Sequence, residues 1–157
     1  MGGVGTAMQV VVLAGGVGSR LRPWTQSIPK PLLPMLDLTL LERVVEAIPT
    51  DMIDEVIVAG GYKVDMIEAY FKGKDIDFDV RIVPEDEPVG TGGALGNCRD
   101  VVSGTFACFN GDIVSSLSIE PMLELHRNHG GIGTLALWEV EDPTRFGIVG
   151  VNDEQPL

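Results

Sequence analysis

The amino-acid sequence predicts an α/β protein with a mostly parallel sheet covered by helices. Short apolar runs rich in β-branched residues alternate with segments in which apolar residues recur every three or four positions. Strands of a parallel sheet are buried on both faces, whereas the connecting helices are apolar on one face only. At 157 residues, 45% of them hydrophobic, the chain is long enough to form one domain with its own core.

Several short runs have the composition of buried strands. The first, residues 9–14 (QVVVLA), is apolar after its first residue and is followed by glycine. Residues 55–59 (EVIVA) have the same character and also precede glycine. Further strands are predicted at residues 79–83, 105–109, 134–138 and 147–151.

The segments between these runs have the periodicity of helices. Apolar residues at 40, 41, 44, 45 and 48 share one helical face, and so do those at 66, 67, 70 and 71. A third helix is predicted over residues 91–102 and a fourth over residues 118–128, with Ser118 as its capping residue.

Charge is distributed unevenly along the chain. The net charge is −12, yet residues 1–36 contain no acidic residue and include Arg20, Arg22 and Lys30. An acid-free segment in an acidic protein is a candidate anion site, although its apolar strand and loop composition also explains part of the bias. The overall acidity argues against a nucleic-acid partner, because binding a phosphate backbone requires a broad basic face.

Other features argue against membrane, secreted and zinc-binding classes. The apolar runs are about five residues long, whereas a bilayer-spanning helix needs ~20. Cys98 and Cys108 lack the spacing of a zinc site or a disulfide framework, so we expect buried thiols and a cytoplasmic location. One interpretation of residues 1–7 is a sequence added ahead of a native start at Met8.

A glycine-rich loop follows the first predicted strand. Ligands of parallel sheets bind beyond the carboxyl ends of the strands, and Gly15, Gly16 and Gly18 would let backbone amides approach a phosphate there. A simple tight turn is the alternative explanation. Neither standard fingerprint is matched, because Leu21 stands where the dinucleotide pattern needs glycine and Ser19 where the Walker pattern needs lysine.

Two cations favour the phosphate-binding interpretation. Arg20 lies within the glycine-rich loop, and Lys30 lies between Pro29 and Pro31, which restrict the backbone that carries it. An arginine presents a planar fork to phosphate oxygens and a lysine presents a point charge. Two fixed cations beside a glycine loop suit a triphosphate.

The run LAGGVGSRLRPWTQSIPKPLLPM at 13–35 resembles the signature of the sugar nucleotidyltransferases, approximately GGxGxRLxPxTxxxPKPxxP. The resemblance continues through VAGGY at 58–62, EPVGTGGAL at 87–95, FNGDI at 109–113 and DPTRFGIV at 142–149. It implies the nucleotide-diphospho-sugar transferase fold, a Rossmann-like, mostly parallel mixed sheet sandwiched by helices. It also implies an enzyme that uses Mg²⁺ to join a sugar 1-phosphate to a nucleoside triphosphate, with release of pyrophosphate.

The resemblance assigns roles to individual residues. Arg20 and Lys30 would be the catalytic cations, and Asp112 would bind Mg²⁺, although an aspartate after a strand also commonly forms a turn. Trp24 stands where the family commonly has leucine, and we interpret it as local packing. The remaining residues assigned by the resemblance are Leu13, Ala14, Gly15, Gly16, Gly18, Ser19, Glu85, Pro88, Gly90 and Thr91 for the nucleotide, and Gly111 and Gly147 for the sugar.

Glu85 bears on the choice of base. An ionised carboxylate only accepts hydrogen bonds, and guanine offers two adjacent donors, whereas uracil and thymine offer one donor between two acceptors. The phrase around Glu85 also resembles that of guanylyltransferases that make GDP-mannose and GDP-heptose. We therefore favour GTP and keep UTP and dTTP as alternatives.

The chain departs from the family pattern at its end, and other classes stay open. The family continues into a segment that holds the sugar phosphate, so we expect residues 8–157 to be the nucleotide-binding part of a longer domain. Such a chain would expose an apolar edge, which makes homo-oligomer formation an expectation.

A nucleotide-sensing regulatory subunit on the same fold is the main alternative. An NAD-dependent oxidoreductase fits the α/β pattern but not the glycine spacing.

Overall fold

The computed structural model describes residues 7–151 of the chain, so residues 1–6 of the proposed N-terminal addition lie outside the described part. Two units are distinguished, Met1–Leu117 and Ser118–Leu157. The first contains the sheet and its connecting helices, and the second contains one longer helix followed by irregular chain. Among residues 7–151, none of the helices has the length and apolar character that crossing a membrane requires.

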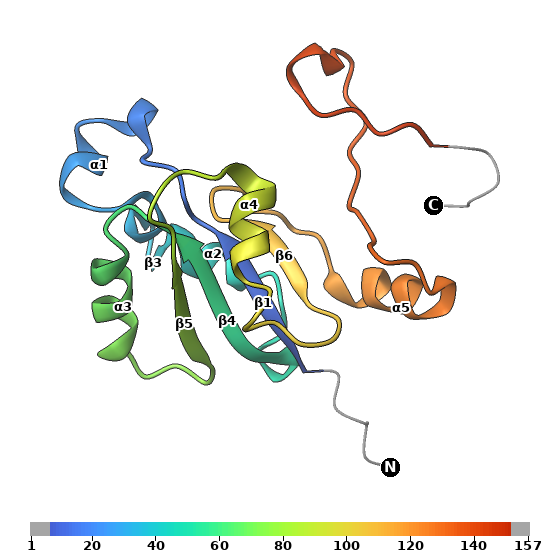
Figure 1. Cartoon of the computed structure of the whole chain (residues 1–157), viewed down its shortest axis with the longest axis horizontal. Coiled ribbons are helices and arrows are strands. Elements are labelled where there is room, and N and C mark those ends of the chain that lie inside the picture. The colour runs from blue at the N-terminus through green and yellow to red at the C-terminus, as the bar shows by residue number, and fades with distance from the viewer. Residues whose placement is uncertain (1–6, 152–157) are drawn as a thin grey trace. The chain divides into compact units, whose positions relative to one another are not determined.

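The first unit is built on a four-stranded sheet in which every pairing is parallel (Figure 1). β1 (Met8–Leu13) lies in the middle, between β4 and β6. The spatial order is β5-β4-β1-β6. The other strands are β4 (Ile53–Gly60), β5 (Asp79–Pro84) and β6 (Ala107–Asn110), so the four strands predicted in this unit are confirmed.

Short elements occupy the long connection from β1 to β4. Its first part contains two 3-10 turns and a single turn of α-helix, and a small antiparallel hairpin then leads into α2. The bounds are η1 (Ser19–Leu21), α1 (Trp24–Ser27), η2 (Lys30–Leu32), β2 (Pro34–Met35), β3 (Leu38–Thr39), α2 (Leu40–Val45) and η3 (Thr50–Met52).

The core is the sheet and the helices that cover it. Val10, Val11 and Val12 of β1 have no exposed surface, and burying a valine side chain stabilises the fold by roughly 1.5–3 kcal/mol. α3 (Val64–Lys72) connects β4 to β5, and α4 (Gly90–Asn97) connects β5 to β6. α4 lies in front of the sheet and α2 behind it in Figure 1. The predicted fold, a mostly parallel sheet sandwiched by helices, is confirmed.

The helix predicted over residues 91–102 is shorter than expected. α4 ends at Asn97, and the chain continues through a turn in which Val101 N–H donates to the Cys98 carbonyl at 3.0 Å. Four of the eight residues of α4 are glycines, each costing about 1 kcal/mol relative to alanine within a helix. The apolar periodicity of the sequence therefore extends beyond the last helical residue.

The predictions of strands at residues 134–138 and 147–151 are wrong. Both segments are irregular in the second unit, where Leu135 is 70% and Trp138 89% exposed. A β-branched composition favours extended chain, but a strand forms only when a neighbour completes its backbone hydrogen bonds. Within the described residues, no strand pairs with either segment.

The fourth predicted helix is confirmed as α5 (Ile119–His129). Ser118 occupies the capping position, but its hydroxyl donates to the carboxylate of Glu120 and accepts no hydrogen bond from a backbone N–H of the helix, as a capping side chain would. The helix ends at Gly130, which has the left-handed conformation (φ 64°) that glycine adopts without strain.

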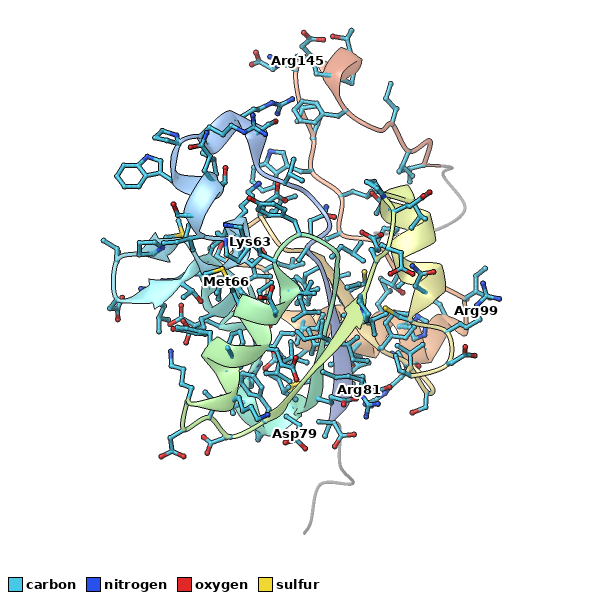
Figure 2. The ribbon with its side chains drawn as sticks, turned by 60° about the vertical axis from the view of Figure 1, so that its left-hand side comes forward. Lys63, Met66, Asp79, Arg81, Arg99 and Arg145 are labelled. Atoms are coloured by element: carbon cyan, nitrogen blue, oxygen red, sulfur yellow. The ribbon has the colours of Figure 1, made fainter. Side chains whose placement is uncertain are left out.

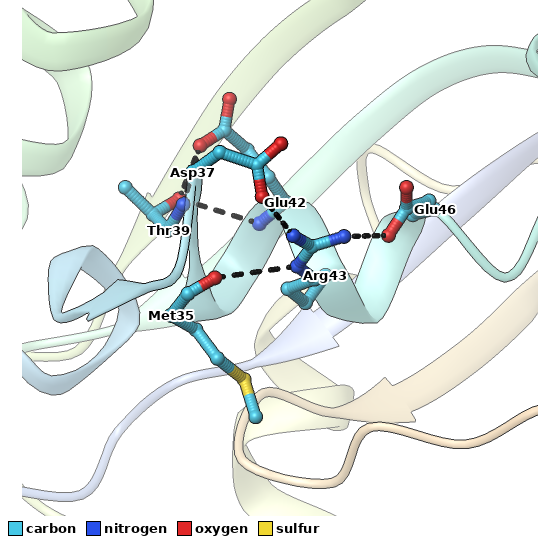
Figure 3. Close-up of polar contacts among 6 residues, drawn as sticks. All are labelled: Met35, Asp37, Thr39, Glu42, Arg43 and Glu46. Atoms are coloured by element: carbon cyan, nitrogen blue, oxygen red, sulfur yellow. Dashed lines mark hydrogen bonds and ion pairs between the residues drawn. The ribbon is translucent and has the colours of Figure 1, made fainter.

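A polar network joins the β2–β3 hairpin to α2 and α3. Thr39 caps α2, and its backbone N–H donates to Glu42 at 2.7 Å in return (Figure 3). Glu42 also accepts hydrogen bonds from Tyr70 at 3.0 Å and from Lys74. In the same network, Arg43 bonds the Met35 carbonyl and the carboxylates of Asp37 and Glu46 (Figure 3).

We expect Glu42 to make the free energy of unfolding depend on pH in the acidic range. Its burial acts to raise its pKa, but the hydrogen bond from Lys74 and those from neighbouring hydroxyl and amide groups outweigh burial and lower the pKa from 4.5 to about 2. A carboxyl whose pKa is lowered in the folded state stabilises the fold above pH 4.5 and loses that contribution as the pH falls towards 2.

Urea unfolding at pH 7, 4.5 and 2.5 would measure this contribution. Glu42→Gln should lower the free energy of unfolding at pH 7 by about 1–3 kcal/mol and should flatten its decline below pH 4.5. Asp37→Asn is the control, because this carboxylate belongs to the same network but its side chain is 80% exposed, and its removal should cost less than about 1 kcal/mol. Equal decreases in the free energy of unfolding in Glu42→Gln and Asp37→Asn would contradict the special contribution assigned to Glu42.

Candidate nucleotide-binding site

The carboxyl ends of all four strands lie at one edge of the sheet, because every pairing is parallel. Hydrogen bonds continue beyond the strand ends and hold the following loops together. Ala14 N–H donates to the Ala59 carbonyl at 2.7 Å, and Gly111 N–H donates to the Leu13 carbonyl at 2.9 Å. Glu85 is held in the same way by the carbonyl of the last residue of β4. The predicted site residues after β1, β5 and β6 are therefore brought to one edge.

Lys30 and Asp112 meet in an ion pair at this edge. The Nζ atom of Lys30 lies 2.6 Å from Oδ2 of Asp112, although the two residues are 82 positions apart. Their side chains are 24% and 50% exposed, so the pair stays accessible to solvent and contributes little to stability. The structure thus brings together one of the two predicted catalytic cations and the predicted metal ligand.

Gly18 is the point at which the glycine-rich loop packs on itself. Its φ of 62° lies in the left-handed region, and a Cβ there would approach Thr25 Cγ2 to 2.8 Å and Lys30 Cβ to 3.3 Å. Thr25 is only 2% exposed, and its hydroxyl donates to the Gly18 carbonyl at 2.8 Å. Glycine is required here both for conformation and for space, and this packing contributes to the position of Lys30.

The other loop residues are more open. Ser19 and Arg20 form η1 and are exposed, and Arg20 takes no part in the ion pair of Lys30. Trp24 is 72% exposed, so its interpretation as local packing is wrong. The indole of Trp24 lies on the surface of the loop.

Glu85 lies against the glycine-rich loop. A Cβ on Gly15 would come within 2.4 Å of Oε2 of Glu85, and a Cβ on Gly61 within 2.5 Å of its backbone oxygen. The carboxylate therefore faces the loop after β1. Gly16 is different, because a Cβ there would meet nothing within 4 Å.

The remaining predicted residues fall into two groups. Pro88, Gly90 and Thr91 are exposed at the start of α4, and Gly90 has a left-handed φ of 73° that favours glycine. Gly111 is buried, and a Cβ there would come 2.9 Å from the Leu13 carbonyl. Gly147 follows η4 (Pro143–Arg145) in the second unit and is exposed. The sugar contacts of Gly111 and Gly147 stay predictions.

Sequence reasoning assigned no role to Lys63, or to Tyr62 at the end of the VAGGY segment, and missed the contacts of both residues. The Tyr62 hydroxyl donates to the Thr25 carbonyl at 2.9 Å, and Lys63 Nζ donates to the Gln26 carbonyl at 2.6 Å. Both residues follow β4, and their partners lie 37 positions earlier in the chain. No local pattern indicates such contacts.

Asp112 offers a carboxylate to a metal ion at this edge, beside Lys30. Within the described residues no group of three or more histidine, cysteine or acidic side chains is arranged to hold a metal. Mg²⁺ commonly takes one or two protein carboxylates and completes its shell with substrate phosphates and water. The exposed carboxylate of Asp112 beside a cation-bearing loop fits that requirement.

The chain belongs to the nucleotidyl transferase family, whose model matches residues 9–156. It is 36% identical over 147 residues to the mannose-1-phosphate guanylyltransferase catalytic subunit beta of Xenopus tropicalis, covering 90% of this chain and 41% of that protein. It is 38% identical over 149 residues to the mannose-1-phosphate guanylyltransferase of Mycobacterium tuberculosis, covering 94% and 42%. The chain thus spans about two-fifths of the curated relatives it matches. Enzymes of this family generally use a divalent metal ion.

Solved structures show the same fold. HddC from Yersinia pseudotuberculosis, complexed with GMP-PN, matches with a TM-score of 0.64 and 32% identity over 76% of this chain and 54% of that one. A UDP-glucose pyrophosphorylase complexed with UDP-glucose matches with a TM-score of 0.63 over 79% of this chain and 55% of that one. At 19% identity, the second likeness shows the fold alone.

The close approach of the loops can be tested with paired glycine variants. Gly61→Ala should destabilise the protein by about 1–3 kcal/mol, because its Cβ meets the Glu85 backbone oxygen, which cannot move aside cheaply. Gly16→Ala is the matched control and should change stability by less than about 1 kcal/mol. Denaturant midpoints would report both values, and a neutral Gly61→Ala would show that the loops are less tightly packed than described.

Proposed function

We propose that this protein is a sugar-1-phosphate nucleotidyltransferase, which joins a sugar 1-phosphate to a nucleoside triphosphate and releases pyrophosphate. A mannose-1-phosphate guanylyltransferase-like activity is favoured by the names of its relatives. The observation that carries the proposal is the meeting of Lys30 and Asp112 at the carboxyl edge of the sheet, beside the glycine-rich loop.

The reaction requires positioning and charge neutralisation more than covalent chemistry. A phosphate oxygen of the sugar 1-phosphate attacks the α-phosphorus in line, and the bond from that phosphorus to the oxygen bridging it to the β-phosphorus breaks. The departing pyrophosphate keeps the electron pair of that bond. Arg20 and Lys30 are proposed to hold the β- and γ-phosphates, so that their charge opposes the charge that develops on the leaving oxygen.

The ion pair of Lys30 with Asp112 supports this assignment. Its exposure means that a phosphate oxygen can replace the carboxylate as the partner of Lys30 at little cost. Asp112 would then be free to hold Mg²⁺, which supplies positive charge to the phosphate oxygens when it is bound. The amides of Gly15 and Gly16 are proposed to face the phosphates from the end of β1.

The preference for GTP rests on Glu85. Its carboxylate faces the loop after β1 and would accept hydrogen bonds from the two adjacent donors of guanine. Support comes from the guanylyltransferase names of the relatives and from HddC, whose solved complex contains GMP-PN. Pro88, Gly90 and Thr91 would line the same side of the nucleotide.

We further propose a cytoplasmic enzyme with nucleotide and sugar phosphate as its partners and without a nucleic-acid partner. Cys98 and Cys108 are both free, as a reducing compartment would allow, although only Cys98 is buried and the expectation of a buried thiol is wrong for the exposed Cys108. Burial raises the pKa of the Cys98 thiol, which keeps it neutral. The acidic composition disfavours nucleic acid.

Pyrophosphate release would test the reaction directly. With Mg²⁺, GTP and mannose 1-phosphate, Lys30→Ala should lower turnover by roughly 10²- to 10³-fold, because a donor to the developing charge is lost. Lys72→Ala, at an exposed position of α3, should leave turnover unchanged. Nucleotide binding by the wild type without turnover on any sugar phosphate would favour a regulatory subunit over an enzyme.

Competing nucleotides would test the role of Glu85. Glu85→Gln should weaken GTP use relative to UTP by roughly 10- to 100-fold, because one acceptor becomes a donor that guanine cannot satisfy. Asp86→Asn is the control, since this neighbouring acid is exposed. The assignment fails if the wild type prefers UTP, or if the ratio of kcat/KM values for the two nucleotides is unchanged in Glu85→Gln.

A further inference from the structure

The loop that carries Arg20 and Lys30 lies outside the sheet and needs other contacts to hold it. The loop spans residues 15–30, and most of its residues are partly or fully exposed. Its only α-helical element, α1, is four residues long, which is too short to be stable by itself. Something beyond local structure must therefore fix the positions of the two cations.

The turn between β4 and α3 supplies such contacts through Lys63. Figure 2 labels the side chain of Lys63. Its Nζ atom donates to the carbonyl of Gln26 at 2.6 Å and to that of Ser27 at 2.9 Å. These carbonyls end α1, where helical hydrogen bonding leaves acceptors without an intrahelical partner. A charged ammonium donor makes stronger bonds to them than a neutral group would.

Tyr62 adds a second contact, which leads inward to Lys30. Its hydroxyl donates to the Thr25 carbonyl, and the buried Thr25 side chain in turn bonds Gly18. The positions of Gly18, Thr25 and Lys30 are coupled by packing, since a Cβ on Gly18 would press on both of the others. Displacement of α1 would therefore also move Lys30.

The backbone of Lys63 indicates that its side chain matters. With φ at 52°, this residue has the left-handed conformation, which costs a residue with a Cβ about 1 kcal/mol and which glycine adopts freely. A lysine at a position that suits glycine is consistent with a side chain whose contacts offset that cost.

We propose that Lys63, together with Tyr62, is a positioning residue that clasps α1 and so presents Arg20 and Lys30 to the triphosphate. Lys63 acts through the loop, because its ammonium is engaged by the carbonyls of α1. The catalytic part of this inference rests on the proposed function, whereas the anchoring of the loop does not.

Lys63→Gly tests the side chain without straining the backbone. In the full-length protein, hydrogen–deuterium exchange of a peptide covering residues 24–33 should be about tenfold faster, because opening of the loop becomes easier. The thermal midpoint should stay within a few degrees of the wild type, since glycine suits the conformation. With GTP and mannose 1-phosphate, kcat should fall about tenfold through misplacement of the cations.

Three further variants separate anchoring from a merely structural effect. Lys63→Arg keeps two donors to the carbonyls and should restore both the slow exchange and kcat. Tyr62→Phe should raise the exchange of the same peptide through loss of its hydrogen bond to Thr25. Lys72→Ala, at the other end of α3, should match the wild type in both measurements.

Each outcome decides one part of the inference. Unchanged exchange in Lys63→Gly would overturn the clasp, and faster exchange with unchanged kcat would overturn its role in positioning. A wild type without turnover on any nucleoside triphosphate would refute the proposed function, and the exchange rates would still decide whether Lys63 anchors the loop.

Discussion

The parallel pairing of β1 with both of its neighbours is the constraint on which the rest of the structure depends. β1 pairs with β4 along one side and with β6 along the other, and its central valines are completely buried. Because all four strands run in the same direction, the loops that follow them meet at one edge of the sheet. The glycine-rich loop, Glu85 and Asp112 are brought together for this reason alone.

Close approach at that edge explains why glycines stand where they do. A side chain at Gly61 would collide with the backbone just after β5, and one at Gly111 with the backbone at the end of β1. At Gly18 a side chain would press on neighbouring side chains and would also require an unfavourable φ. At Gly16 space is available, so a phosphate could lie there without competing with a side chain. The glycines therefore divide into those that allow packing and those, such as Gly16 and Gly90, that leave the surface open.

The charged groups at the candidate site and those in the supporting structure differ in exposure and in their contribution to stability. Lys30 and Asp112 form an exposed pair that adds little stability and can exchange partners. Glu42 is largely enclosed by its hydrogen-bond donors, and its bonds hold α2, α3 and the β2–β3 hairpin together. The chain thus combines a fixed carboxylate in its framework with an exchangeable one at its candidate site.

The sequence by itself determined the elements whose signals are local. The apolar run of β1, the glycines after it and the motif containing Lys30 are contiguous, so neighbouring residues suffice to identify the strand, the loop and the candidate cation. The same applies to the family, because its motifs span nearly the whole chain. Glycine and proline at fixed spacing indicate backbone geometry directly, which explains why the strand and the loop were predicted correctly, whereas the role of Lys30 stays a prediction.

Tertiary structure alone decided the features that need a partner distant in sequence. The predicted strands at residues 134–138 and 147–151 have suitable composition but remain irregular, because no described neighbour completes their hydrogen bonds. The ion pair of Lys30 with Asp112, and the contacts of Lys63 with α1, join residues 82 and 36–37 positions apart. Composition encodes which residues can form such contacts, but only the order of strands in the sheet decides which of them meet.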